Sequence, residues 1–362
     1  MDVVFFPRND YPSKVEVCNH RLGKKMTYTD QTDGLHYSDS TASYIPYTTM
    51  AKTRNIKVGC FVGLSSAISD PDGIIKSDYN SGNIWLDAYS LAPNIQDKVI
   101  HPSQYGNITQ EEWNAAYNNY LYPNFYAFTG KKPVALSYSY GTDNFKAYVT
   151  QFLGARNSLI SGNTDYGVGC GNPSDVAYSF SVFNSKMCSM RWYDQAKANG
   201  NDFQGQLAIV SAKIDETMLD GGWLNNFTHW HNYYSDGNEQ WAEAYLNLLA
   251  SKNTNDEIYF AGYGEALAYL VYRQLVTKVV MYSPVKHHNV QLVIMLETNN
   301  TLGVDTDLLQ VPISVKFSTA GTPLEGQTIK SNCNIISLRN NQYIVEIPYG
   351  RFPIAVIDKI ST

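Results

Sequence analysis

The stretch Gly222-Trp223-Leu224-Asn225-Asn226-Phe227-Thr228-His229-Trp230-His231 decides the fold, because it predicts a buried strand that ends in two histidines. Side chains alternate faces along an extended chain, so His229 and His231 are expected to point to the same side. Other residues of the same chemistry also lie at or just beyond the ends of predicted strands: Asp30, His36 and His101. In a parallel α/β barrel, the carboxyl ends of the strands carry the chemistry. The sequence therefore predicts a site at one mouth of such a barrel.

Working outward from this stretch, predicted strands alternate with predicted helices. The strands are expected at residues 24–30, 56–63, 97–102, 134–138, 155–160, 222–231 and 258–263. The helices are expected at residues 40–52, 84–91, 109–120, 143–153, 238–251 and 264–276, and residues 208–210 are β-prone. This alternation indicates a parallel sheet that is closed or nearly closed into a barrel.

From Val279 onward the pattern changes, since short strands alternate with Asn, Gly and Thr turns and no helix is predicted. Such a pattern is typical of a small all-β sandwich. We therefore expect two domains, a barrel over residues 1–283 and an immunoglobulin-like β-sandwich over residues 284–362.

Composition limits the function classes. A net charge of −6 without a basic run argues against nucleic acid as a partner. No apolar run approaches the length of a membrane span, and the N-terminus lacks the pattern of a signal peptide. Either the protein is cytosolic, or a leader has been removed, or it leaves the cell by another route, such as assembly into a virus particle; of these, an extracellular or virion-associated location is the one we expect. The 28 Tyr and 6 Trp suit flat polar ligands such as sugars, although a compositional bias of the genome would explain them equally well. Five cysteines without a Cys-x-x-Cys support neither a zinc ribbon nor a disulfide framework.

Four segments resemble the motifs of the polysaccharide deacetylase family, carbohydrate esterase family 4. They are Thr27-Tyr28-Thr29-Asp30-Gln31-Thr32-Asp33-Gly34, Ile100 to Tyr105, Ser137-Tyr138-Ser139-Tyr140-Gly141 and Phe227-Thr228-His229. The resemblance covers residues 24–276 and implies an irregular (β/α)7 barrel. It also implies a metal-dependent hydrolase that removes acetyl groups from a bacterial surface or extracellular polysaccharide. The sequence departs from the family where Gln31-Thr32 is inserted and where Tyr105 replaces a second histidine.

The resemblance assigns roles to individual residues. Asp30 would be the catalytic carboxylate and His229 the general acid, a role that suits an imidazole. Asp33, His101 and His231 would hold a divalent metal, for which zinc is the first choice. His36 is an alternative to His231. The substrate would contact Tyr138, Tyr140 and Trp230. Each assignment has a structural alternative: an Asp-rich turn at 30–34, a hydrogen-bonding His101 at a strand end, and histidines that pack on Trp230.

A second function fits the same residues. The barrel has then lost its metal site and acts as a glycan-binding or structural module, for example of a phage tail, with the β-sandwich attaching it to other subunits. The missing second histidine and the insertion of Gln31 favour this alternative. The extra His231 and the retained Asp30, His101 and His229 favour the hydrolase, and an active or once-active hydrolase is the preferred expectation. Carbohydrate is the expected partner in both cases.

Overall fold

The structure is a computed structural model that describes residues 8–35, 37–63, 70, 72–139, 144–157, 169–170, 187–284, 291–301, 303–350 and 353–360. The chain forms two compact units. The first, which we call the barrel unit, comprises Lys25–Leu267. The second, the β unit, combines Met1–Lys24 with Ala268–Thr362.

The barrel unit is built on one sheet, whose described strands follow the order β7-β6-β5-β4-β3-β10-β9-β8. Their bounds are β3 (Met26–Leu35), β4 (Val58–Gly63), β5 (Ile84–Tyr89), β6 (Ala135–Tyr138), β7 (Gly154–Asn157), β8 (Gly169–Cys170), β9 (Met187–Met190) and β10 (Trp223–Phe227). Neighbouring strands are parallel, except that β8 is antiparallel to β9. A further parallel strand, β11 (Ile258–Ala261), pairs with the first half of β3, whereas β4 pairs with its second half.

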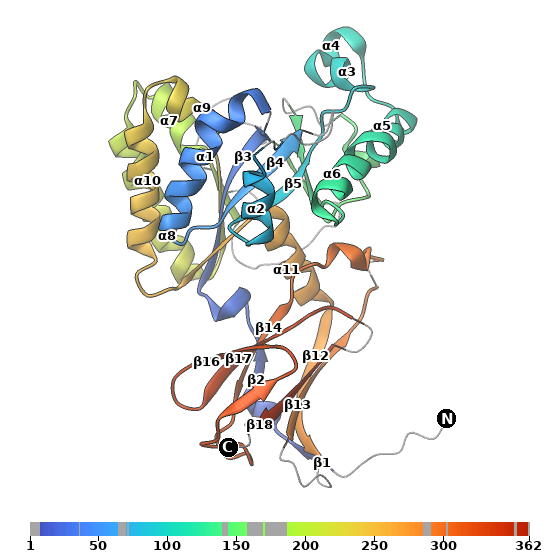
Figure 1. The fold of residues 1–362 in the computed structure, drawn as a ribbon, viewed down its shortest axis with the longest axis vertical. Helices are drawn as coiled ribbons and strands as arrows, with labels where there is room; N and C mark the ends of the chain where they lie inside the picture. The colour runs from blue at the N-terminus through green and yellow to red at the C-terminus, as the bar shows by residue number, and fades with distance from the viewer. Residues whose placement is uncertain are drawn as a thin grey trace. The chain divides into compact units, whose positions relative to one another are not determined.

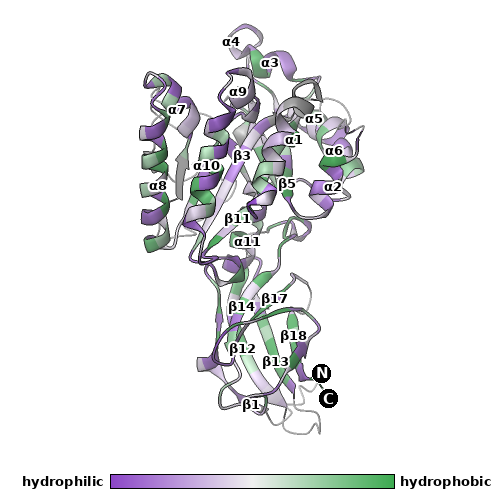
Figure 2. Ribbon diagram, turned by 60° about the vertical axis from the view of Figure 1, so that its left-hand side comes forward, coloured by the Kyte–Doolittle hydropathy of each residue, from purple (hydrophilic) through white to green (hydrophobic). Residues whose placement is uncertain are grey.

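Helices cover this sheet (Figure 1). The helices of this unit are α1 (Tyr37–Thr53), α2 (Ile74–Asn80), α3 (Gln96–Ile100), α4 (Pro102–Tyr105), α5 (Gln110–Ala116), the π-helix η3 (Tyr117–Leu121), α6 (Tyr122–Thr129), the short η5 (Lys146–Tyr148), α7 (Trp192–Ala198), α8 (Phe203–Asp220), α9 (Trp230–Ser235) and α10 (Glu239–Lys252). Helix α11 (Tyr263–Leu275) contributes residues to both units. Helix α8 shows why such segments fold: Phe203, Leu207, Val210 and Ile214 are buried at helical spacing, while Gln204, Ala208 and Ile209 are exposed. Figure 2 shows the resulting alternation of hydrophobic and hydrophilic turns along α8.

The sheet is strongly curled. Strand β6 lies three positions from β3, which would separate them by about 14 Å in a flat sheet. Yet Ser137 Oγ of β6 lies 3.0 Å from Asp33 Oδ2 of β3. Such a contact requires the sheet to bend around its inner face. The barrel unit is therefore a curled, parallel α/β sheet, as the sequence predicted.

Close packing inside this sheet depends on glycine. A Cβ built at Gly59 of β4 would lie 3.2 Å from the Cα of Gly262, and a Cβ at Gly262 would overlap the side chain of Trp85. The segment that follows β11 can therefore approach β4 and β5 only because these two residues lack side chains.

The β unit consists of two antiparallel sheets, with strand orders β1-β12-β13-β18-β15 and β16-β17-β14-β2. Their bounds are β1 (Arg8–Asp10), β2 (Val15–Val17), β12 (Val276–Pro284), β13 (Gln291–Thr298), β14 (Ile313–Ser318), β15 (Ile329–Ser331), β16 (Asn334–Ser337), β17 (Gln342–Ile347) and β18 (Ile354–Lys359), with short helices η1 (Pro12–Lys14), η2 (Arg21–Gly23) and η6 (Thr306–Leu308). Alternate residues of β13 and β18 are fully buried, among them Leu292, Ile294, Ala355 and Ile357. Hydrophobic residues are conspicuous along β13, β14 and β18 in Figure 2. The two sheets thus enclose an apolar core.

The division into units differs from the expected domains of residues 1–283 and 284–362. Strand β1 pairs with β12, and β2 pairs with β14. The first 24 residues therefore belong with the C-terminal strands. The sequence could not show this, because the pairing joins segments more than 250 residues apart.

Several expected elements also differ, and of the helix expected at residues 143–153 the described residues form only the short η5. Residues 84–89 form strand β5 in place of a helix, since the segment is buried on both faces and shows no alternation. Residues 96–105 form helices α3 and α4 in place of a strand, with Pro102 at the first position of α4. Residues 208–210 lie within helix α8. None of the described helices has the length and apolar content that a membrane span requires.

Candidate functional site

Strand β3 carries both expected carboxylates, and it separates them. Its even-numbered residues face helices α1 and α10, because Asp30 contacts Tyr47 and Tyr245. Its odd-numbered residues face the inside of the curled sheet, where Asp33 contacts Ser137. Residues three apart in a strand point to opposite faces. Asp30 and Asp33 therefore cannot act on one substrate atom or bind one metal ion.

Asp30 lies in a cage of hydroxyl and amide groups. Its carboxylate accepts hydrogen bonds from Tyr47 (2.6 Å), Asn226 (2.6 Å) and Tyr245 (3.1 Å). The side chain is fully buried. Burial raises the pKa of Asp30 to about 6, and the three hydrogen bonds oppose this rise. The residue predicted as a catalytic carboxylate thus connects β3 to α1, α10 and β10, away from the inner face.

Asp33 is neutralised by an arginine. Arg156 of β7 forms an ion pair with Asp33, and its Nη2 also donates to Ser137 Oγ at 3.1 Å. The side chains are 7% and 3% exposed, so the pair is almost completely withdrawn from water. The guanidinium carbon of Arg156 lies 4.1 Å from the ring centroid of Phe227 and 5.0 Å from that of Phe61. These five residues come from β3, β4, β6, β7 and β10, and we call them the strand-end cluster.

The two histidines of the opening stretch adjoin this cluster. The strand ends at Phe227, earlier than expected, and His229 precedes the first residue of α9. The His229 ring lies 4.9 Å from the Phe227 ring and 5.3 Å from the His231 ring, centroid to centroid. Burial lowers the pKa of His229, and the nearby carboxyl of Asp33 opposes this effect. Among the described residues, neither imidazole forms a hydrogen bond.

A second arginine completes the surroundings of Phe227. The guanidinium carbon of Arg191 lies 4.9 Å from the Phe227 ring centroid. Arg191 also forms an ion pair with Asp194, at 2.6 Å, on the first turn of α7. Neither Arg191 nor Arg156 is among the site residues that the sequence predicts. A charged residue inside the predicted strand at 155–160 was the one available signal, because a buried strand seldom holds an unpaired charge.

His101 lies apart from these residues. It follows helix α3 and precedes α4, its side chain is exposed, and its ring packs 6.4 Å from that of Tyr105. The expectation that it ends a strand placed it at the mouth of the barrel. Because residues 96–105 are helical, the structure does not bring His101 to Asp33 or His231.

The expected substrate residues have mostly packing roles. Tyr138 is 1% exposed and packs edge-on against Phe145. Trp230 is also 1% exposed and stacks on Tyr47 with ring centroids 4.5 Å apart. Tyr140 and His36 lie outside the described residues.

The described residues do not offer a ligand set for a divalent metal. In the described part of the chain, no three His, Cys, Asp or Glu side chains come together as ligands. Asp33, which would have to supply a carboxylate, already faces the guanidinium of Arg156. The positive charge of Arg156 therefore occupies the place beside Asp33 that a cation would need.

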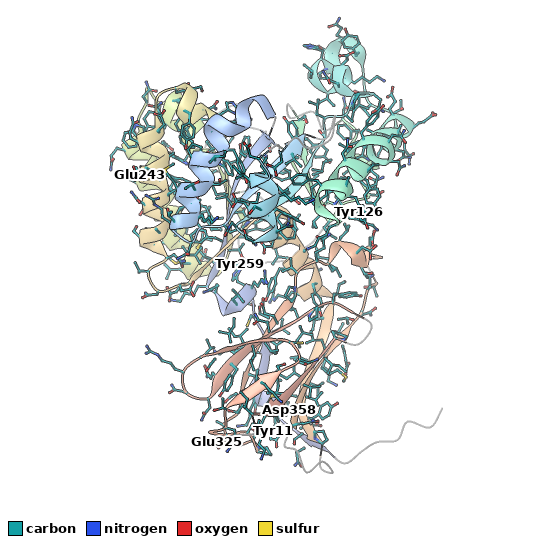
Figure 3. The ribbon with its side chains drawn as sticks, in the orientation of Figure 1. Tyr11, Tyr126, Glu243, Tyr259, Glu325 and Asp358 are labelled. Carbon is teal, nitrogen blue, oxygen red and sulfur yellow. The ribbon has the colours of Figure 1, made fainter. Side chains whose placement is uncertain are left out.

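The helical segment before β6 presents tyrosine rings at its surface. Tyr117 stacks on Tyr122 at 5.9 Å, and Tyr122 packs against Tyr126 at 5.6 Å. Tyr126 is 50% exposed, and Figure 3 shows it on α6. The row passes through the π-helix η3, and such insertions are frequent at functional sites.

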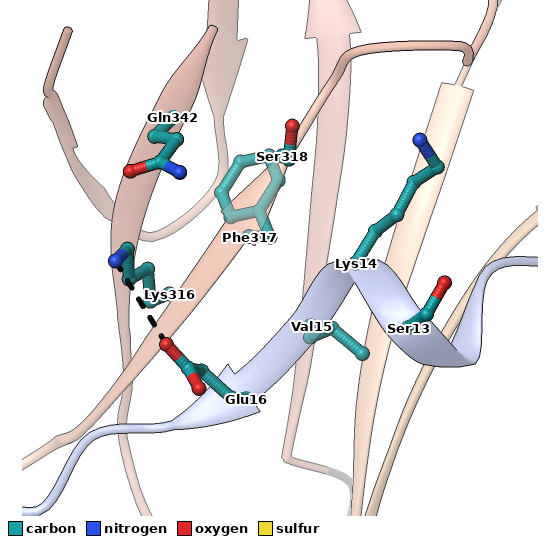
Figure 4. Close-up of a pocket in the computed structure, with 8 residues that line it drawn as sticks. All are labelled: Ser13, Lys14, Val15, Glu16, Lys316, Phe317, Ser318 and Gln342. Atoms are coloured by element: carbon teal, nitrogen blue, oxygen red, sulfur yellow. Dashed lines mark ion pairs between the residues drawn. The ribbon is translucent and has the colours of Figure 1, made fainter. Parts of the chain in front are cut away.

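The β unit contains a hollow of about 190 Å³ beside β2 and β14 (Figure 4). It is lined by Ser13, Lys14, Val15, Glu16, Lys316, Phe317, Ser318 and Gln342. Glu16 and Lys316 approach each other at 3.9 Å across it. This lining mixes both signs of charge and contains no histidine or cysteine.

The barrel unit thus defines a class: a curled parallel α/β barrel whose strand ends carry an arginine–carboxylate cluster. Solved structures similar to this chain include a family 4 carbohydrate esterase from Streptomyces lividans, in complex with acetate. It is 10% identical, with a TM-score of 0.39, over 65% of this chain and 92% of that chain. A putative polysaccharide deacetylase from Mycobacterium smegmatis is 10% identical, with a TM-score of 0.39, over 74% and 96%.

A polysaccharide deacetylase from Bacillus cereus is also similar, at 10% identity and a TM-score of 0.35, over 66% of this chain and 92% of that chain. These structures are of the kind that the sequence motifs resemble. No family model matches the chain. No curated protein matches it either.

Proposed function

We propose that the barrel unit binds a carbohydrate and does not hydrolyse it through a divalent metal. The observation that carries this proposal is the buried ion pair of Asp33 with Arg156. Of the two functions expected from the sequence, it supports the glycan-binding module over the metal-dependent acetyl hydrolase.

The chemistry of the strand-end cluster explains this preference. A catalytic metal acidifies a bound water and polarises a carbonyl, and for this it needs an open coordination position. A guanidinium offers only hydrogen-bond donors and a fixed positive charge. With Asp33 engaged by Arg156 and Asp30 on the opposite face of β3, the described residues provide no base beside an activated water.

The aromatic surface supports carbohydrate as the ligand. Tyrosine combines an apolar ring with a hydroxyl that hydrogen-bonds, which suits the apolar faces and hydroxyl rims of sugars. The row of Tyr117, Tyr122 and Tyr126 offers such rings at successive spacings of 5.9 and 5.6 Å. The polar groups at the ends of the strands would fix the orientation of the bound sugar through hydrogen bonds.

The test measures binding and hydrolysis together on the purified full chain. Binding of acetylated chito-oligosaccharide, xylan and acidic oligosaccharides is followed by calorimetry, and acetate release is assayed with zinc and with a chelator. We expect binding of at least one glycan, with no zinc-dependent acetate release. Acetate release that zinc stimulates and Asp33→Asn abolishes would support the hydrolase instead. Absence of binding to every glycan would leave the barrel as a structural module.

A further inference from the structure

A buried carboxyl group joins three elements of the barrel unit at the start of helix α11. Asp87 of β5 is 2% exposed. Its Oδ1 accepts hydrogen bonds from Trp85 Nε1 at 3.2 Å and from the backbone N–H of Ala135 at 3.1 Å. Its Oδ2 accepts one from the backbone N–H of Gly264, in the first turn of α11, at 2.8 Å. One side chain thus holds β5, β6 and α11 together.

The first turn of α11 packs directly against this carboxyl group. A Cβ built at Gly264 would overlap the Asp87 carboxylate, and one at Gly262 would overlap the side chain of Trp85. The backbone of the turn can approach so closely because both positions lack a side chain. A change in the charge of Asp87 therefore acts on the backbone of α11 without an intervening group.

The surroundings of Asp87 favour its neutral form. In the part of the chain that the structure describes, Asp87 forms no ion pair, and its printed partners are all N–H donors. The nearby Glu265 is 2% exposed and forms an ion pair with Lys57 at 2.8 Å. A carboxylate that is withdrawn from water without a cation is costly, and a second carboxylate nearby adds to the cost. Burial, and to a smaller extent Glu265, raise the pKa of Asp87 to about 7, while the three hydrogen bonds oppose this rise.

The neighbouring elements bring further ionisable side chains toward Asp87 and Glu265. They come from β4, α2, β11 and the segment before β4: Cys60, Tyr79, Tyr259 and Lys57. Burial raises the pKa of Cys60 and brings the pKa of Tyr79 to about 12. Tyr259 donates a hydrogen bond to Glu265 at 2.7 Å, and Lys57 is held in its ion pair with Glu265. Cys60 and Tyr79 thus stay uncharged in the pH range in which Asp87 loses its proton.

We propose that loss of the proton from Asp87 opens the first turn of α11 to water, so that this turn is closed in acid and loosened in alkaline solution. The direction follows from linkage. A carboxyl group that holds its proton more tightly in the closed turn than in water stabilises the closed turn at low pH, and this stabilisation is lost as the pH rises through about 7. The device lies in the helix through which the chain passes from the barrel unit into the β unit. It does not depend on which ligand the barrel binds.

The experiment measures amide hydrogen exchange of the purified full chain between about pH 5.5 and 8.5, with each rate divided by the intrinsic rate at the same pH. The amides of residues 262–266 report on the turn, and those of residues 207–214 in α8 are the internal reference. Asp87→Asn is the test variant, because an amide has the shape of the neutral carboxyl and cannot ionise. Asp78→Asn is the matched control, because Asp78 is also a buried aspartate of the barrel unit, 8% exposed, but pairs with Lys52 of α1 at 3.3 Å.

We expect the protection of residues 262–266 in the wild type to fall by about ten-fold or more between pH 7 and the alkaline end of the range, because each pH unit above the pKa favours the open state by up to about ten-fold. The reference amides of α8 should keep their protection. Asp87→Asn should remain protected at every pH, and Asp78→Asn should show the same fall as the wild type.

Trp85→Phe is a second variant, which keeps the proposal testable if Asp87→Asn does not fold as judged by its melting curve. It removes the Nε1 donor that favours the charged carboxylate, so the fall in protection should move to higher pH. Constant protection of residues 262–266 in the wild type overturns the inference. So does a fall that persists in Asp87→Asn, or one that Trp85→Phe does not move.

Discussion

The ion pair between Arg156 and Asp33 makes a prediction that a double-mutant cycle can test. Arg156→Met removes the guanidinium and leaves Asp33 charged, 3% exposed and without its cation. Breaking one side of a buried ion pair costs about 3–5 kcal/mol, because the remaining charge is uncompensated. Asp33→Asn should cost a similar amount, because Arg156 then keeps only Ser137 and the two aromatic rings.

The double variant isolates the interaction energy between Arg156 and Asp33 from the contacts that each side chain makes with the rest of the protein. With both charges removed, no charge remains unpaired, so we expect the double variant to be more stable than the sum of the single effects by roughly 2–3 kcal/mol. The surface pair of Arg54 and Glu243 is the control, since Glu243 is 58% exposed and such pairs couple by about 0–1 kcal/mol.

Tryptophan fluorescence during urea unfolding is the assay. All 6 Trp residues (Trp85, Trp113, Trp192, Trp223, Trp230 and Trp241) belong to the barrel unit, so the signal reports on that unit alone. A coupling energy between Arg156 and Asp33 no larger than that of the control pair would refute the reasoning. Asp33 would then be available to another partner, and the metal-dependent function would regain support.

Three further predictions follow from the same structure. Burial raises the pKa of Asp30 from 3.8 to about 6, so the stabilisation from its protonated form is full below pH 3.8 and is lost as the pH rises through 6. Relative to Asp30→Asn, the wild type should therefore lose about 2 kcal/mol of unfolding free energy between about pH 4.5 and 7.5. A difference between the two proteins that stays constant over this range would contradict the prediction. Gly262→Ala should destabilise the barrel unit by about 3 kcal/mol or more, because its Cβ would overlap Trp85, and urea midpoints that match the wild type would show that the segment can move. Zinc at millimolar concentration should raise the melting temperature by less than about 1 °C, because a ligand stabilises only the state that binds it; a larger rise, absent in Asp33→Asn, would reveal a metal site.

The sequence predicted the parallel sheet well, because periodicity and strand-end chemistry are local properties. Helix α5 is one example: Thr109 and Glu112 form the capping box that their spacing indicates. Strand β10 and the buried face of α10 were also visible as patterns. Residues 84–89 were misread, since a strand that is buried on both faces loses the alternation that distinguishes it from a helix.

The site was harder to predict, because it depends on which face each side chain takes. Asp30 and Asp33 are close in sequence, yet the two-residue period of β3 places them on opposite sides of the sheet. Arg156 lies 123 residues from Asp33, and only the curl of the sheet brings them together. Without knowledge of the strand order and of the curl of the sheet, no pattern in the sequence could place a residue of β7 beside one of β3.

The identity of the cation beside Asp33 determines what this barrel can do. A bound divalent ion can be lost to a chelator or to acid, whereas arginine stays charged at any pH that a folded protein meets. The ion pair of Arg156 with Asp33 carries no net charge, and a guanidinium lacks the Lewis acidity that would activate water. This contact therefore argues against metal-dependent hydrolysis at Asp33, because the carboxylate that would hold the metal already faces a cation that cannot activate water.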